Sequence, residues 1–193
     1  MKKVRLFIDF DNTLFDRSAF IHDFFGLIKS FGVSDSEIEI SYKAVYKNGY
    51  LGIKSHLEYI NSHIRNINSQ LVLEKYEEFM KNADRYLYGY TIPFLKSVSR
   101  DKYSIELLTV GGVDFQKKKV MCCGLDKYFD KCNYTTEEKA FALKELIDKD
   151  EYFILIDDKE SERESVKKAF INSVVINPIK ERMILIATDG III

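Results

Sequence analysis

The stretch Val4-Arg5-Leu6-Phe7-Ile8-Asp9-Phe10-Asp11-Asn12-Thr13 decides which fold we expect. Its first five residues are mostly apolar and β-prone, and an acidic cluster follows them directly, as at the functional edge of a buried parallel strand. Ligands of open α/β sheets bind at the carboxyl ends of the strands. Two carboxylates this close repel each other unless a cation, a shared proton or backbone donors stabilise them. The stretch therefore predicts a buried parallel strand that ends in a functional site.

The rest of the chain contains three further strand-like runs, at residues 105–110, 152–156 and 173–176. Helical patterns lie between them, at residues 114–123, 136–147 and 161–170. Strands that alternate with helices of about 10–15 residues predict a parallel α/β sheet with right-handed crossovers. We therefore expect a Rossmann-like, three-layer α/β core. Two apolar runs in the tail, residues 183–193, suggest an added edge hairpin.

A long segment without a convincing buried strand separates the first strand from the second. Its first part places apolar residues at helical spacing, namely Phe20, Phe24, Leu27, Ile28 and Phe31. We predict a core of residues 1–16 and 91–193, with a helical cap of residues 17–90 inserted into it. Because the insertion leaves the sheet directly after the acidic cluster, we expect it to cover that cluster as a lid. Aromatic residues such as Tyr42 are expected to form the core of this lid.

Composition argues against several classes of protein. The 193 residues carry 29 Lys and Arg against 30 Asp and Glu, and this near balance argues against a nucleic-acid polymer as partner. No segment approaches the roughly 18 uncharged apolar residues of a membrane span. The three cysteines, of which Cys122 and Cys123 are adjacent, argue against a disulfide framework. We expect a cytoplasmic protein without a membrane partner, and the sequence leaves its oligomeric state open.

The acidic cluster has three interpretations other than catalysis. It could cap a helix, although two Asp, an Asn and a Thr in five residues exceed what a cap needs. It could be a calcium loop of the EF-hand type, but that loop requires Gly and Glu where this chain has Leu14 and Phe20. It could also be the Asp-x-Asp of a metal-dependent sugar transferase. The motifs that follow decide against this last interpretation.

Three more motifs follow in a fixed order along the chain. Thr109-Val110-Gly111-Gly112 closes the second predicted strand, Lys139 lies in the first turn of a predicted helix, and Asp157-Asp158 ends a later strand. Together with Asp9-x-Asp11-x-Thr13 they resemble the four motifs of the haloacid dehalogenase superfamily. The resemblance covers residues 3–178. It implies an α/β hydrolase with a helical cap inserted after the first motif.

The resemblance also implies roles for the first two motifs. Asp9 would be the nucleophile that forms an aspartyl-phosphate. Asp11 would protonate the leaving alkoxide and later activate water, while its backbone carbonyl binds the metal. Thr109 would donate its hydroxyl to a phosphoryl oxygen, and the amides around Val110 and Gly111 would add further donors.

The later motifs would complete a magnesium site. Lys139 would neutralise charge on the nucleophile and bind the phosphoryl group, Asp157 would be a carboxylate ligand of Mg²⁺, and Asp158 would bind the metal or its water. Two simpler interpretations stay open at this point. Lys139 follows a possible capping box, Thr135-x-x-Glu138, and could be a solvated helix residue, in which case Lys144 is the substitute. Asp158 could simply cap the next helix.

Asp11 favours phosphate-ester chemistry within the superfamily, because releasing a halide requires no proton donor. The resemblance therefore implies a Mg²⁺-dependent phosphatase that acts on a small phosphomonoester, such as a sugar phosphate or a nucleotide. A phosphotransferase or mutase of the same superfamily is the alternative. A non-catalytic phospho-acceptor of the response-regulator type is a remote one, because there the acidic pair lies near the first strand and the acceptor follows a middle strand.

Overall fold

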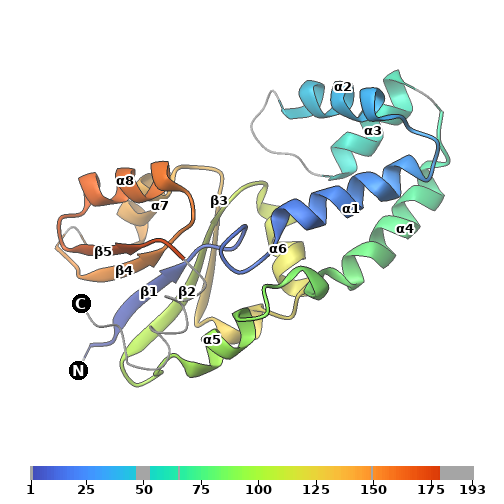
Figure 1. The fold of residues 1–193 in the computed structure, drawn as a ribbon. Helices are drawn as coiled ribbons and strands as arrows, with labels where there is room; N and C mark the ends of the chain where they lie inside the picture. Colours follow the sequence, from blue (N-terminus) through green and yellow to red (C-terminus); the bar gives the residue numbers. More distant parts are fainter. Residues whose placement is uncertain (1, 47–52, 65, 149, 179–193) are drawn as a thin grey trace.

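The computed structural model describes residues 2–46, 53–64, 66–148 and 150–178. Its described strands form one parallel sheet in the order β3-β2-β1-β4-β5 (Figure 1). The strands are β1 (Val4–Ile8), β2 (Tyr103–Val110), β3 (Lys131–Thr135), β4 (Phe153–Ile156) and β5 (Ser173–Ile176). The sheet confirms the predicted Rossmann-like α/β core. The hairpin predicted for 183–193 lies outside the described residues.

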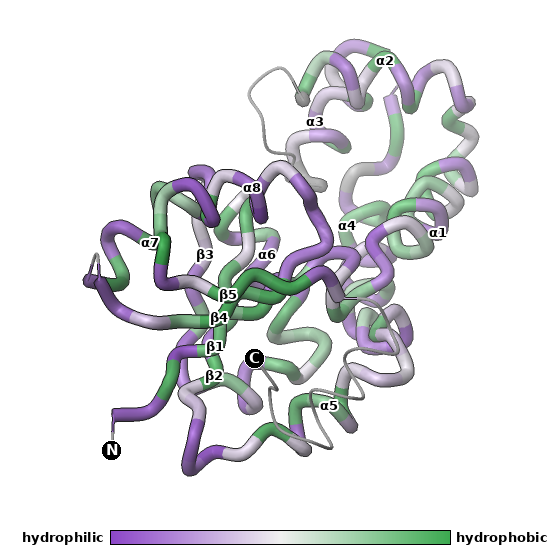
Figure 2. The backbone as a smooth tube through the Cα atoms, turned by 60° about the vertical axis from the view of Figure 1, so that its left-hand side comes forward, coloured by the Kyte–Doolittle hydropathy of each residue, from purple (hydrophilic) through white to green (hydrophobic). Residues whose placement is uncertain are grey.

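Helices cover both faces of the sheet, because side chains of each strand alternate between the faces. Phe7, Leu108 and Leu155 pack with residues of α7 (Lys139–Leu146) and α8 (Glu160–Ala169). Leu6, Ile8, Ile105 and Ile156 belong to the cluster on the other face, which includes residues of α5 (Thr91–Ser97) and α6 (Val113–Cys122). Figure 2 shows hydrophobic residues in the strands between these helices, and hydrophilic residues on the outer turns.

Strand β3 is absent from the sequence-based expectations. Its residues, Lys-Cys-Asn-Tyr-Thr, are half-buried or exposed, as expected at the edge of a sheet, so they lack the apolar run of the other strands. β3 pairs with β2 in a register that places Thr135 beside Val110. It therefore brings a second loop close to the carboxyl end of β2. The following helix begins at Lys139, three residues later than the pattern predicted.

The segment between β1 and β2 is helical, as expected. It contains α1 (Arg17–Lys29), α2 (Asp35–Tyr46), α3 (Ile53–His63), α4 (Ser69–Lys81) and the 3₁₀ turn η1 (Ala83–Tyr86). Asp16 caps α1 through a hydrogen bond from the amide of Ala19 at 2.9 Å. α1–α4 extend away from the sheet beyond the carboxyl end of β1 (Figure 1). The division into a core of 1–16 and 91–193 and a cap of 17–90 stays a prediction.

Two features bear on the composition. None of the described helices has the length and apolar character needed to cross a membrane. Cys122, Cys123 and Cys132 are free thiols. Cys123 is buried, and burial raises the pKa of its thiol to about 12, so this residue is a protonated, apolar contributor to the core.

Candidate active site

A tight turn after β1 places the first motif at the end of the sheet. Asp9 continues the strand, and its amide donates to the carbonyl of Ile156 at 2.9 Å. Asn12 adopts a positive φ of 62°, a conformation that Asn tolerates better than most residues. Thr13 is fully buried, and its hydroxyl accepts a hydrogen bond from the amide of Asp158 at 3.2 Å. Thr13 thereby joins the loop after β1 to the loop after β4.

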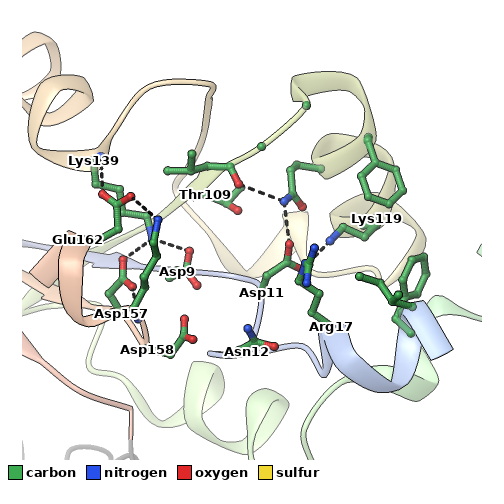
Figure 3. Close-up of a pocket in the computed structure, with 18 of the residues that line it drawn as sticks. Asp9, Asp11, Asn12, Arg17, Thr109, Lys119, Lys139, Asp157, Asp158 and Glu162 are labelled. Carbon is green, nitrogen blue, oxygen red and sulfur yellow. Dashed lines mark hydrogen bonds and ion pairs between the residues drawn. The ribbon is translucent and has the colours of Figure 1, made fainter. Parts of the chain in front are cut away.

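Lys139 lies between the first and last motifs. Its ammonium is 2.5 Å from a carboxylate oxygen of Asp9 and also forms an ion pair with Asp157 (Figure 3). All three residues are buried. Asp9, Asp157 and Asp158 each offer a carboxylate oxygen, and these oxygens lie within 4.8 Å of one another. The structure thus brings together four of the predicted site residues, with more negative than positive charge.

Burial and this surplus of negative charge together shift the pKa values of the cluster. The pKa of Asp9 is raised to about 7, chiefly by burial and also by the neighbouring Asp157, while Lys139 opposes the shift. Burial and the neighbouring Asp157 also raise the pKa of Asp158. Burial alone would lower the pKa of Lys139, but Asp9 and Asp157 outweigh it and the net shift is upward. Three carboxylates at this spacing are the hard oxygen donors that Mg²⁺ prefers, so the residues fit a divalent cation.

Neighbouring side chains hold Lys139 and Asp157 in place. The amide of Lys139, the first residue of α7, donates to the buried carboxylate of Glu162 at 2.9 Å. One oxygen of Asp157 accepts from the amide of Lys159 at 2.8 Å. Arg163 donates to the backbone carbonyl of Asp157 at 2.9 Å. The cluster is therefore fixed before any ligand binds, as electrostatic catalysis requires.

The simpler interpretation of Lys139 does not hold. The hydroxyl of Thr135 accepts from the amide of Glu137 at 2.9 Å and caps a turn that precedes the helix, so no capping box forms around Lys139. Lys144, the substitute candidate, is exposed in the last turn of α7. Lys139, by contrast, is 2% exposed and paired to two carboxylates.

Thr109, near the carboxyl end of the neighbouring strand β2, lines the same cavity. Its side chain is buried, and its hydroxyl oxygen has no hydrogen-bond partner in the described part of the chain. A buried hydroxyl without a partner is costly, which fits a group that binds a ligand oxygen. Val110 and Gly111 line the cavity too. The predicted role of the Gly111 amide needs correction, however, because this amide donates to the carbonyl of Thr135 at 2.8 Å and is not available to a ligand.

Asp11 lies in the cavity but apart from the carboxylate cluster. One of its oxygens is 2.5 Å from the ammonium of Lys119, and the other accepts from the side-chain amide of Gln116 at 2.8 Å (Figure 3). The predicted contact of Asp11 with the metal would therefore have to come from its backbone carbonyl, as the resemblance implied. The carboxylate itself has a separate environment, as a general acid/base distinct from the nucleophile would need.

Lys119 is a site residue that sequence analysis missed. It is 1% exposed, and its ammonium lies 4.9–5.8 Å from the centres of four phenylalanine rings, those of Phe10, Phe15, Phe20 and Phe115. Burial lowers the pKa of Lys119, and Asp11 opposes this shift. Lys119 is the last of three consecutive lysines in α6, and composition alone does not reveal which one is buried.

A cavity of about 500 Å³ connects the motifs with the inserted helices. Arg17 and Phe25 of α1, Tyr42 of α2 and His56 of α3 line its other side. Tyr42 was expected in the core of the lid, and it lines the cavity instead. The volume is within the usual range for small-molecule sites and exceeds what a phosphate ion alone requires. The cavity can therefore enclose both a phosphoryl group and the group it is attached to.

No family model matches this sequence, and no curated protein matches it significantly. Solved structures do match. A Burkholderia xenovorans LB400 protein assigned as a haloacid dehalogenase-like hydrolase has a TM-score of 0.73 at 17% identity, over 92% of this chain and 84% of that chain. YfnB of Bacillus subtilis, assigned as a HAD hydrolase and bound to magnesium, has a TM-score of 0.59 at 12% identity, over 91% and 86%.

A third match is the L-2-haloacid dehalogenase of Xanthobacter autotrophicus with chloropropionic acid covalently bound. Its TM-score is 0.55 at 13% identity, over 100% of this chain and 85% of that chain. At these identities the matches establish a fold. The chain has the fold of the haloacid dehalogenase-like hydrolases, as its four motifs predicted. This fold supports several chemistries, so the reaction has to be argued from the site.

Proposed function

We propose that this protein is a Mg²⁺-dependent phosphatase that hydrolyses a small phosphomonoester through an aspartyl-phosphate on Asp9. The observation that carries the proposal is the buried cluster in which Lys139 contacts both Asp9 and Asp157, with Asp158 beside them. An anionic nucleophile attacks a phosphate dianion only if nearby positive charge screens both. In this cluster Lys139 supplies one positive charge, and the three carboxylates can bind a cation that supplies more.

The first half of the reaction transfers the phosphoryl group to the protein. A carboxylate oxygen of Asp9 attacks phosphorus, and the bond between phosphorus and the alcohol oxygen breaks. Lys139 and the hydroxyl of Thr109 stabilise the charge on the phosphoryl oxygens. Asp11 gives its proton to the leaving alkoxide, so that a neutral alcohol departs. Mg²⁺, held by Asp9, Asp157 and Asp158, would supply the remaining positive charge.

The second half returns the protein to its starting state. A water molecule attacks the phosphorus of the aspartyl-phosphate and gives a proton to Asp11, the bond between phosphorus and the Asp9 oxygen breaks, and inorganic phosphate leaves the restored carboxylate. Lys119 and Gln116 hold the carboxylate of Asp11 at the cavity wall, apart from Asp9. This separation supports two different roles for two carboxylates that are only two residues apart.

Asp11 also favours phosphatase over dehalogenase activity. A halide leaves without a proton, so a dehalogenase has no use for an acid at this position. Here the sequence provides a carboxylate, and the fold places it in the same cavity as the nucleophile with two partners of its own. The magnesium bound to the Bacillus subtilis neighbour is consistent with a cation at this kind of site.

A panel of phosphorylated metabolites, assayed for phosphate release with Mg²⁺ present, tests the proposal. We expect turnover of at least one small ester, and loss of that turnover when a chelator removes the metal. Metal-independent hydrolysis would contradict the role of Asp157. Transfer of the phosphoryl group to a second alcohol, rather than to water, would instead support the phosphotransferase or mutase alternative.

A further inference from the structure

His56 of α3 lies in the wall of the cavity. It is polar, and the proposed reaction gives it no role. It is 2% exposed, and it lies against the rings of Phe24 and Phe25, with ring centres 6.3 and 5.9 Å away. Ser41 of α2 is its hydrogen-bond partner, at 2.8 Å from Nδ1. On this side Phe20, Ile21 and Phe25 line the cavity, and its polar groups there are Arg17, the aromatic hydroxyl of Tyr42 and His56.

The hydrogen bonds of Ser41 determine which nitrogen of His56 carries the proton. The Ser41 hydroxyl donates its single proton to the carbonyl of Ile38 at 2.8 Å. It can therefore only accept from His56, so Nδ1 of the ring is protonated. Burial lowers the pKa of His56 to about 4, which keeps the ring neutral near neutral pH. Nε2 is then an unprotonated hydrogen-bond acceptor.

This acceptor has no partner within the described residues. Buried polar groups are nearly always paired, so an unpaired one in the wall of a ligand cavity points to a group on the ligand. Because Nε2 carries a lone pair and no proton, the missing partner has to be a donor. A hydroxyl or an amino group satisfies it, whereas a carboxylate, a carbonyl or a hydrocarbon does not.

We propose that Nε2 of His56 accepts a hydrogen bond from a hydroxyl or amino group of the leaving alcohol. This inference rests on the proposed function and narrows its substrate to phosphate esters of polyhydric or amino alcohols. The phosphoryl group binds at Asp9 and Lys139, and the donor group of the alcohol reaches the helices of the inserted segment. The apolar residues between them, such as Phe25, contact the carbon skeleton.

Matched pairs of esters test the proposal. Each pair has one carbon skeleton with and without a hydroxyl, for example a sugar phosphate and its deoxy analogues. We expect removal of one particular hydroxyl to lower kcat/KM at least about tenfold, because a site built to bind a hydroxyl rejects the analogue that lacks it. Equal kcat/KM values across every pair, with hydrolysis intact, would overturn this inference while leaving the proposed function standing.

Two substitutions connect the effect to Nε2. His56→Phe removes the acceptor and keeps a ring. The preference, measured as the ratio of kcat/KM for the hydroxylated ester to kcat/KM for its deoxy analogue, should therefore fall toward one. His56→Gln returns an acceptor oxygen and should restore part of the preference. His22→Phe, at an exposed position of α1, is the matched control and should keep the preference of the unchanged protein. A preference that survives His56→Phe would overturn the assignment.

A measurement without turnover covers the case in which no ester is hydrolysed. Nitrogen-15 NMR of the histidine rings reports which nitrogen is protonated. We expect His56 to carry its proton on Nδ1, and we expect its Nε2 signal to move when glycerol, pentitols or amino alcohols are added. A proton on Nε2, or no response to any of these alcohols, would overturn the proposal independently of the phosphatase activity.

Discussion

The cavity contains two buried lysine–aspartate arrangements that look alike and differ in charge balance. Lys139 contacts Asp9 and Asp157, with Asp158 nearby, so its surroundings carry surplus negative charge. Lys119 contacts Asp11, is surrounded by aromatic rings and lies near the guanidinium of Arg17, so its surroundings carry no surplus of negative charge. A buried site with surplus negative charge attracts a cation, and the bound cation can then screen a phosphoryl group, whereas a site without that surplus holds a side chain in position. The comparison assigns cation binding and nucleophilic attack to the first arrangement, whereas in the second Lys119 positions the general acid Asp11.

The largest effect should follow from removal of the nucleophile. Asp9→Asn keeps the size of the side chain and eliminates the attacking carboxylate, so hydrolysis of an aryl phosphate should fall below about one thousandth of its original rate. A phosphate-release assay measures this directly, with circular dichroism as the check on folding. Full retained activity would show that another group attacks phosphorus.

The two lysines should respond differently to the same substitution. Lys139→Met leaves Asp9 and Asp157 without their ammonium, and breaking a buried pair of this kind costs about 3–5 kcal/mol. The Lys139→Met variant should also lose its phosphatase activity. Lys119→Met should cost less stability, because the side chain of Asp11 is 17% exposed and can reach water. Its activity should still fall about 10²-fold, since the general acid loses its support.

Thermal unfolding and steady-state kinetics of both lysine variants provide the comparison. Lys117→Met is the matched control, because Lys117 is exposed on the same helix as Lys119, and it should change neither quantity appreciably. Equal losses of stability in Lys139→Met and Lys119→Met would remove the distinction between the two arrangements. An unchanged rate in Lys119→Met would remove the positioning role of Lys119.

The burial of Asp9, together with the negative charge of Asp157 beside it, should also make the metal-free protein less stable as pH rises. The pKa of Asp9 is raised from 3.8 to about 7 in the folded state. Below pH 3.8 the group is protonated in both states and has no effect. As pH rises toward about 7, the unfolded state releases its proton first, so the free energy of unfolding decreases. Above about pH 7 both states are ionised, and the free energy of unfolding stays at this lower value.

Melting temperatures of the metal-free protein between about pH 5 and pH 8 test this linkage. Asp9→Asn lacks the titrating group, so its melting temperature should exceed that of the unchanged protein by a margin that grows toward pH 7. A margin of about 2–4 °C corresponds to roughly 1 kcal/mol in a domain of this size. Added Mg²⁺ should stabilise the unchanged protein more than the variant. A margin independent of pH would contradict the raised pKa.

The smallest effect on activity should come from Gly111, which lies against the Gln116 side chain that donates to Asp11. A Cβ at this position would lie 2.7 Å from the side-chain nitrogen of Gln116, and the φ of +157° is one that L residues rarely adopt. Gly111→Ala should therefore displace Gln116 from Asp11, cost about 1 kcal/mol and reduce activity a few-fold. Gly89→Ala, with open space around the new carbon, is the control. Identical behaviour of the two variants would show that Gln116 adapts freely.

The features that sequence reasoning predicted are those in which local pattern and chemistry agree. The apolar run before Asp9 is a buried strand, and parallel pairing brings the end of that strand beside the ends of β2 and β4. Thr109, Lys139 and Asp157 were placed by motif order, and they meet in one cavity. Their roles in catalysis stay predictions until the experiments above are done.

The missed features depend on tertiary packing. The edge strand β3 has no apolar run, because solvent covers part of it. Lys119 is buried by rings that come from three separate segments, which no local pattern reports. The amide of Gly111 is occupied by Thr135 only because β3 pairs with β2. The proposed role of His56 as an acceptor depends on its hydrogen bond with Ser41, which lies on another helix.

The most direct test of the central claim is the chemical state of Asp9 during turnover. The protein is mixed with a phosphate ester and Mg²⁺, quenched in acid, digested and analysed by mass spectrometry. The account predicts a peptide that contains Asp9 and is heavier by one phosphoryl group, absent from the Asp9→Asn variant and from samples with chelator. Hydrolysis that proceeds without this peptide, or with the phosphoryl group on another residue, would contradict it.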